Sequence, residues 1–174
     1  SQTRPTGMGL ASPDQNDADF SYVIKYVATA GPQGLPLLKP PYRRITAIDL
    51  NKGEFAWQIP FGNGPINHPA LKGLDLGPLG SGFGDVVAEG GIVVTKTLLI
   101  TYISKRDQLG DREATGSFLW ALDKQNGEIV GEVAVDARLH GAPMTYMQDG
   151  RQYIAVAAGG RRETQQLIAF ALPR

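Results

Sequence analysis

One stretch, ITAIDLNKGEFAWQIP from Ile45 to Pro60, restricts the possible folds of this chain more than any other. Apolar residues alternate with other residues on both sides of Asn51-Lys52-Gly53, and such alternation predicts two strands that each turn one face toward a core. Gly53 can adopt the positive φ that a tight turn needs. The stretch therefore predicts an antiparallel β-hairpin.

The hairpin pattern occurs again 74 residues later, where ALDKQNGEIV from Ala121 matches AIDLNKGEFA from Ala47 with Ala, Asp, Gly and Glu in register. The second copy contains Asn126-Gly127, a pair typical of type I′ turns. Repeated strand–turn–strand units without helices between them favour a radial all-β array, a β-propeller. An offset of 74 residues exceeds a common blade of roughly 40–50, so the chain must contain an insertion between the copies.

Further strands are predicted along the chain by β-branched and alternating segments, with turn residues between them. They are 20–30, Ile92–Thr95, Leu98–Ile103, 117–124, 128–135, Pro143–Gln148, Gln152–Ala157 and 166–172. At most one helical turn is expected, within 105–116. This count gives one four-stranded blade from about Ile92 to Val135 and a last blade of three strands.

Two segments lack any strand or helix period. Residues 1–19 are polar and irregular, which leaves 20–174 as a partial propeller domain. Residues 61–85 form a long loop rich in glycine and proline, and long ordered loops are usually functional. Its Gly80-Ser81-Gly82 segment has neither the dinucleotide nor the Walker spacing, so it does not indicate a nucleotide site.

Composition excludes several classes of function. Seventeen basic and seventeen acidic residues cancel, so no nucleic acid or acidic surface is indicated as a partner. The absence of cysteine excludes disulfides and thiolate metal sites. No apolar run is long enough for a bilayer. A targeting segment, if the protein is exported, is expected outside these residues.

Few side chains suggest chemistry by themselves. His68 and His140 are the only histidines, and two without a third ligand do not indicate a metal site. We interpret both as solvated or hydrogen-bonded loop residues. Asp49 and Asp123 are interpreted as carboxylates that accept backbone N–H groups at the two turns. No catalytic residue or metal ligand is assigned.

The A-x-D-x-x-x-G-x-x-x-W pattern that ends at Trp57 resembles the tryptophan-docking motif of the quinoprotein dehydrogenases, eight-bladed propellers that bind pyrroloquinoline quinone (PQQ). Three more stretches, 34–50, 90–100 and 141–160, resemble the carboxyl-terminal end of the glucose-dehydrogenase-like branch. The second hairpin departs from the motif, because Gly131 stands where the first has Trp57. We therefore expect a docking contact to be missing one blade later.

The resemblance implies an enzyme that oxidises a sugar or alcohol by hydride transfer to PQQ held with Ca²⁺, whose ligands are expected outside this chain. It also implies that the glycine-rich turn at Gly159, Gly160 and Arg161 lies near the cofactor, where Arg161 could meet a carboxylate of the quinone. The alternative is a tight surface turn with solvated Arg161 and Arg162. Some glucose-type relatives have histidine in the place of Arg161, so the substrate stays open.

On this interpretation the chain is two to three four-stranded antiparallel blades of a larger periplasmic or cell-envelope propeller. Its partners would be the remaining blades or further copies, a small sugar or alcohol, and a quinone or cytochrome electron acceptor. A non-catalytic propeller that serves as a scaffold, or an inactive fragment, remains the alternative. We expect Trp57 to be buried between blades, and the apolar face of Ile92, Val94 and Leu99 to lack a neighbour within this chain.

Overall fold

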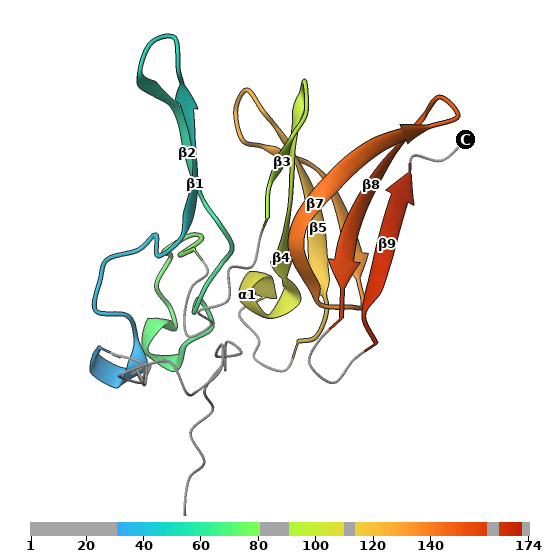
Figure 1. Ribbon diagram of the computed structural model, residues 1–174. Coiled ribbons are helices and arrows are strands. Elements are labelled where there is room, and N and C mark those ends of the chain that lie inside the picture. The colour runs from blue at the N-terminus through green and yellow to red at the C-terminus, as the bar shows by residue number, and fades with distance from the viewer. Residues whose placement is uncertain (1–30, 81–90, 110–113, 160–163, 172–174) are drawn as a thin grey trace, which may run out of the picture.

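The computed structural model describes residues 31–80, 91–109, 114–159 and 164–171. Within these ranges nine strands form three antiparallel sheets that stand side by side (Figure 1). The predicted strand at 20–30 lies outside the described residues. No described helix is both long and apolar enough to cross a membrane.

The first sheet is the predicted hairpin, with β1 at Arg44–Asp49 and β2 at Glu54–Pro60. Ala47 pairs with Trp57, and the register then shifts between Ala47 and Ile48, which marks a bulge. A 3₁₀ turn at Pro32–Gly34 precedes the hairpin, and another at Pro69–Leu71 follows it.

The second sheet contains β3 (Val93–Val94), β4 (Leu98–Ser104), β5 (Ser117–Asp123) and β6 (Ile129–Val135), in that spatial order. The short helix α1, Lys105–Leu109, follows β4. The sheet confirms the predicted four-stranded blade, and α1 confirms the one expected helical turn. A register shift between Ala121 and Leu122 repeats the shift seen in the first hairpin.

The third sheet has β7 (Leu139–Gln148), β8 (Arg151–Ala158) and β9 (Gln166–Ala171). Its three strands confirm the predicted incomplete last blade, but β7 begins four residues before the expected Pro143. A register shift between His140 and Met144 explains the difference. Proline has no N–H for the ladder, and an irregularity at this place lets the strand continue past it.

The two repeated turns share one geometry. Gly53 N donates to Asp49 O over 2.7 Å, and Gly127 N donates to Asp123 O over 2.8 Å. The Asp49 carboxylate accepts Asn51 N at 2.9 Å, and the Asp123 carboxylate accepts Gln125 N at 2.7 Å. These bonds confirm that both aspartates organise their turns.

The type I′ prediction for Asn126-Gly127 is wrong. That turn needs positive φ at both central residues, whereas here only Gly127, at 79°, has it. The aspartate carboxylate and the bulge give a wider turn that needs one glycine. Asp149 and Gly150, with φ of 51° and 72°, have the type I′ signature instead.

Two apolar cores hold the sheets together. One lies between the first and second sheets and includes Ile45, Phe61, Leu99, Ile103, Trp120 and Leu122. The other lies between the second and third sheets and includes Ile100, Tyr102, Leu119, Val135, Leu139, Val156 and Ala158. The blades therefore pack face to face, as in a propeller.

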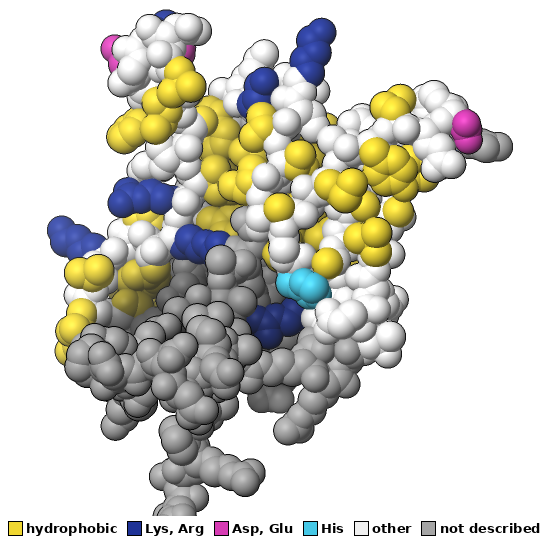
Figure 2. All heavy atoms as spheres, viewed as in Figure 1, with side chains coloured by type: hydrophobic (Ala, Val, Ile, Leu, Met, Phe, Trp, Pro, Cys, Tyr) yellow, Lys and Arg dark blue, Asp and Glu magenta, His cyan; other side chains and the backbone are white. Residues whose placement is uncertain are grey.

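The expected exposed face is only partly observed. Ile92 and Val94 are 45% and 59% exposed, in agreement with the prediction. Leu99 is buried, so the prediction is wrong for this residue. The first hairpin covers this part of β4. Figure 2 shows that hydrophobic side chains gather on the surface that β3 and β7 share in this view.

Trp57 joins the first sheet to the second. Its indole nitrogen donates to Lys124 O over 2.9 Å, and its ring lies on Gly127, where an added Cβ would be 2.7 Å from the ring. The predicted docking on the hairpin turn of the next blade is confirmed. The ring also packs against the core between the first and second sheets and remains partly exposed.

Candidate cofactor-binding rim

The rim is the end of the sheets at which β5, β7 and β9 begin and β4 and β8 end, opposite the hairpin turns (Figure 1). Gly159 lies here, directly after β8, with φ of 130°. Its N–H donates to Arg138 O over 2.8 Å. A Cβ on Gly159 would lie 2.8 Å from Thr164 O, so the loop after β8 needs glycine for its own closure.

Gly160 and Arg161, the other two residues predicted to contact the cofactor, lie outside the described residues. Their role stays a prediction. The requirement for glycine at position 159 is explained by the local loop, which does not depend on a nearby ligand.

His140 also lies at the rim, in β7 and not in the expected loop. Its Nε2 atom is 2.9 Å from Oε1 of Gln165, the residue directly before β9. His68 lies in the loop after β2, where its Nδ1 accepts Ala70 N at 3.2 Å and begins a 3₁₀ turn. Both histidines are hydrogen-bonded to the protein, as expected.

The inner parts of the second and third sheets meet closely at the rim. Tyr102, fully buried in β4, donates its hydroxyl to Gly141 O over 2.8 Å. Gly91 lies so tightly against the backbone of Gly141 and Ala142 that no Cβ could fit. The glycine at 91 thus allows two blades to approach each other at backbone distance, whereas Gly141 has a φ of 73° and open space around it.

The described part of the long loop, 61–80, is tied to the neighbouring blade. Asn63 Nδ2 donates to Gln108 O over 2.5 Å, and Asn67 Nδ2 donates to Leu109 O over 2.7 Å. These two asparagines satisfy carbonyl groups at the end of α1, which has no further turn to do so. This part of the loop therefore connects the first blade to the second.

Gly80 packs against the backbone of Arg43 immediately before β1, and its N–H donates to Gly62 O over 2.9 Å. It therefore lies at the same end of its blade as Gly159 does in the last one (Figure 1). The rest of the two segments, 81–85 and 160–161, lies outside the described residues. A site shared by the two loops remains a prediction.

On the face of the rim that Figure 2 shows, the charged side chains of the described residues are positive. Figure 2 shows Lys and Arg side chains and one histidine at the border of the described surface on this side. The carboxyl group of Asp136 accepts Lys105 Nζ over 2.7 Å, and this hydrogen bond, with the lysine charge, lowers the pKa of Asp136. Positive charge suits a quinone that carries carboxylates.

Whether a calcium ion fits the described residues depends on the ligands that calcium needs. Calcium takes six to eight oxygen ligands, several of them carboxylates. Among the described residues no three His, Cys, Asp or Glu side chains come together to hold a metal ion. The part of the chain that is described therefore does not fit the metal.

Sequence reasoning missed several contacts of the rim. Nothing in the spacing pairs Asn63 with Gln108, because these residues are far apart in sequence and their contact depends on how two blades pack. In the sequence, nothing distinguishes Tyr102 from the apolar residues of the same predicted strand. Only the Gly90-Gly91 pair gave a signal, since paired glycines mark close backbone approach.

The repeated hairpin, its docked tryptophan and the face-to-face sheets define this chain as a set of β-propeller blades. The family model described as the β-propeller domain of glucose/ethanol/alcohol dehydrogenases matches residues 2–154, which is most of the chain. The chain belongs to this family of PQQ-dependent dehydrogenases.

Individual relatives agree with the family. The chain is 32% identical over 150 residues to the glycerol dehydrogenase large subunit of Gluconobacter oxydans, covering 80% of the chain and 18% of that protein. It is 30% identical over 150 residues to the quinate/shikimate dehydrogenase (quinone) of Acinetobacter baylyi, covering 81% and 17%. It is 27% identical over 157 residues to quinoprotein glucose dehydrogenase A of Acinetobacter calcoaceticus, covering 87% and 18%. The chain thus spans about a fifth of the length of these relatives.

Proposed function

We propose that this chain supplies the carboxyl-terminal blades of a PQQ-dependent dehydrogenase that oxidises a sugar, polyol or related alcohol. The observation that carries the proposal is the family match over residues 2–154, in a chain whose blades are joined by the docked Trp57. The remaining blades would come from polypeptide beyond this fifth of the relatives' length. The proposed setting is the periplasm or cell envelope, with a quinone or cytochrome as electron acceptor.

PQQ, when bound, would supply a quinone carbonyl that accepts a hydride from the alcohol carbon. The part proposed for this chain is to form one wall of the cofactor site at the rim. The Gly159–Arg161 turn would bring backbone close to the flat ring, and the Arg161 guanidinium would pair with a carboxylate. The metal ligands and the catalytic base are proposed to lie in other blades.

The supporting geometry is the position of the two loops. Gly159 and Gly80, the last described residues of their segments, lie at the same end of the blades. The glycine requirement at 159 has a local cause, so Arg161 is the sharper test of cofactor contact.

The test is a titration of the protein, complete with its remaining blades, with PQQ and Ca²⁺. Binding is followed by absorbance, and activity by dye reduction with glycerol, quinate and glucose. We expect saturable binding and alcohol-dependent dye reduction. Arg161→Ala should weaken PQQ binding by about tenfold or more, as for the loss of a charged hydrogen bond, while the neighbouring Arg162→Ala is the matched control.

Two results would contradict the proposal at different levels. No PQQ binding by the complete protein would favour the scaffold alternative. PQQ binding that is equally tight in Arg161→Ala and the parent would leave the enzyme class intact and remove the turn from the site.

A further inference from the structure

The turn of the second hairpin contains Asn126-Gly127, two residues that can react with each other. Asn–Gly occurs twice in the chain, at Asn63-Gly64 and at Asn126-Gly127. Asparagine is one of the thermolabile residues, and a following glycine has no Cβ that would keep its backbone nitrogen away from the asparagine side chain. In an unfolded chain, an asparagine before glycine therefore deamidates faster than an asparagine before a larger residue.

The reaction joins the backbone nitrogen of Gly127 to the side-chain carbon Cγ of Asn126. Gly127 N loses its proton and bonds to Cγ, while the bond from Cγ to Nδ2 breaks and Nδ2 leaves as ammonia with that proton. Water then opens the resulting cyclic imide at one of its two carbonyl carbons, which leaves aspartate or isoaspartate. Water enters and ammonia leaves, so the step needs no oxidant or reductant.

In the folded structure both reacting groups are engaged in hydrogen bonds. Gly127 N donates to Asp123 O over 2.8 Å, and Asn126 Oδ1 accepts Glu128 N at 2.9 Å. Gly127 is buried, although Asn126 beside it is exposed. Formation of the imide would break the first bond and rotate the backbone between the two residues. The turn must therefore open locally before it can react.

The Trp57 ring of the neighbouring blade covers Gly127. A Cβ built on Gly127 would lie 2.7, 2.9 and 3.0 Å from three carbon atoms of the indole. The indole nitrogen also donates to Lys124 O in the same turn, over 2.9 Å. Opening of the turn would disrupt both contacts, so the docked ring stabilises the closed form.

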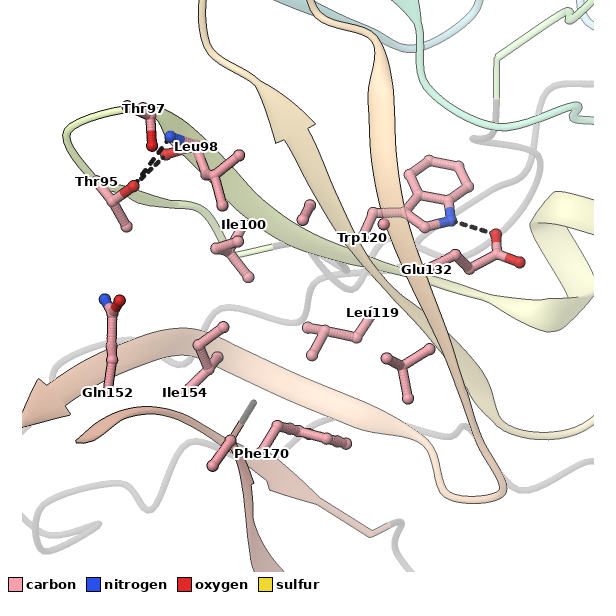
Figure 3. Close-up of a pocket in the computed structure, with 14 residues that line it drawn as sticks. Thr95, Thr97, Leu98, Ile100, Leu119, Trp120, Glu132, Gln152, Ile154 and Phe170 are labelled. Atoms are coloured by element: carbon pink, nitrogen blue, oxygen red, sulfur yellow. Dashed lines mark hydrogen bonds between the residues drawn. The ribbon is translucent and has the colours of Figure 1, made fainter. Parts of the chain in front are cut away.

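The next blade interface lacks such a ring. Gly131 stands where the first hairpin has Trp57, and a Cβ added to Gly131 would meet only the Ala121 Cβ, at 3.6 Å. Gly131 lines an apolar cavity of about 390 Å³ between the second and third sheets. The cavity walls also include Leu119, Ile154 and Phe170 (Figure 3). An interface without the ring thus keeps an open space among the described residues, and we expect the cover of Gly127 to be lost with Trp57.

The other Asn–Gly pair is held by different contacts. Asn63 Nδ2 donates to Gln108 O over 2.5 Å. Gly64 is buried against the backbone of Gly80, which a Cβ on Gly64 would meet. A change that removes only the Trp57 contact should therefore leave Asn63 protected, whereas separation or unfolding of the blades would expose both pairs.

We infer that Asn126 is a latent deamidation site, which the docked Trp57 ring keeps unreactive while the first two blades are in contact. When that contact opens, Gly127 N attacks Asn126 and the turn changes irreversibly. Isoaspartate adds one carbon atom to the backbone of the turn, which moves Gly127 N away from Asp123 O. Trp57 then loses the surface on which it docks, so the reaction makes the opening of this interface permanent.

Peptide mapping by mass spectrometry tests the inference in the complete protein. The parent and Trp57→Ala are kept in mildly alkaline buffer, and the replacement of the side-chain NH₂ group by OH is followed at Asn126 and at Asn63. Deamidation of Asn126 should be at least about tenfold faster in Trp57→Ala, because the turn opens more often. Deamidation of Asn63 should stay at the parent rate. Trp57→Phe keeps a ring over Gly127 and should remain close to the parent at both sites.

Two further variants separate the cover of the turn from overall stability. Val156 is 1% exposed in the core between the second and third sheets, so Val156→Ala destabilises the protein without touching the turn. It should leave Asn126 at the parent rate. Trp57→Leu fills part of the core and still uncovers the turn, so it should show a smaller rise at Asn126 than Trp57→Ala.

Three results would overturn the inference. The first is a parent rate at Asn126 in both Trp57→Ala and Trp57→Leu. The second is a rise in Val156→Ala as large as that in Trp57→Ala. The third is an equal rise at Asn63 and Asn126 in Trp57→Ala, because separation of the whole blades would then be the cause. None of these measurements uses PQQ, so they are independent of the cofactor titration.

Discussion

The indole nitrogen of Trp57 lies 2.9 Å from the carbonyl oxygen of Lys124, to which it donates a hydrogen bond, and the two residues belong to neighbouring blades. The ring at the same time covers Gly127, in the turn that follows Lys124. A single side chain thus connects the β2 strand of one blade with the hairpin turn of the next. The Asp123 carboxylate at the start of that turn holds its shape by accepting Gln125 N. The turn of one blade and Trp57 of the other therefore form one contact across the blade interface.

Trp57→Ala should destabilise the complete protein by about 3 kcal/mol, the lower end of the range for aromatic truncation, because the ring is partly exposed. Trp57→Phe keeps most of the ring and loses the hydrogen bond, and should cost about 1 kcal/mol. Urea unfolding measures both. Equal stability of Trp57→Ala and the parent would show that the docking contact does not hold the blades.

Gly127→Ala should be more destabilising than Gly53→Ala, although both glycines have similar positive φ, 79° and 72°. Backbone strain alone should cost roughly 1 kcal/mol at each position. Only at Gly127 would the new methyl group meet the Trp57 ring, whereas nothing lies within 4 Å at Gly53. The added clash is expected to cost about 1–3 kcal/mol. In a Trp57→Ala background the difference should disappear, and a difference that persists would mean that the ring is not its cause.

Tyr102→Phe should cost about 1 kcal/mol, because it removes the hydrogen bond from the buried Tyr102 hydroxyl to the Gly141 carbonyl, which joins two blades at the rim. Thermal unfolding gives the cost, and hydrogen exchange of the amides of β7 should increase near Gly141. Tyr146→Phe is the control, on a ring that stacks on Tyr153 within the third sheet. A thermal stability that Tyr102→Phe leaves unchanged, together with unchanged hydrogen exchange in β7, would contradict the assigned contact.

The Lys105–Asp136 pair predicts a small dependence of stability on pH. The pKa of Asp136 is lowered in the folded state, so its contribution to stability is complete above the unfolded value of about 3.9 and is lost as the pH falls through the lower folded value. The effect is small because the carboxylate is exposed. Urea midpoints of Asp136→Asn and the parent should therefore differ slightly at pH 6 and converge in strong acid. A difference between the two urea midpoints that is the same at pH 6 and in strong acid would contradict the assigned pair.

The strands and the repeat could be predicted from the sequence because both are local properties. Alternation of apolar residues identified the two hairpins, and the register of Asp49 with Asp123 identified their common turn. The missing dock at Gly131 was also predicted, since it required only a comparison of the two copies. The apolar cavity that Gly131 and Phe170 line depends on how two blades pack and has no local signal.

Other features were outside the reach of local patterns. The early start of β7 was missed because proline is tolerated at the first residue of a strand, so the strand was expected to begin at Pro143. The register shift that lets it begin earlier has no sequence signature. Leu99 was expected to be exposed, but it is buried by a hairpin that lies about fifty residues earlier in the chain. Gly159 was expected to make room for a cofactor, and its own loop proved to require it.

The central claim is that these blades are an indispensable part of a PQQ-dependent dehydrogenase. Reconstitution tests it most directly: this chain and a separately produced polypeptide that carries the remaining blades are mixed with PQQ and Ca²⁺, and alcohol-dependent dye reduction is measured. We expect neither polypeptide to be active alone, the chain alone to aggregate through its uncovered apolar faces, and the mixture to be active. Full activity of the other polypeptide without this chain, or a monodisperse and cooperatively unfolding monomer of this chain alone, would contradict the account.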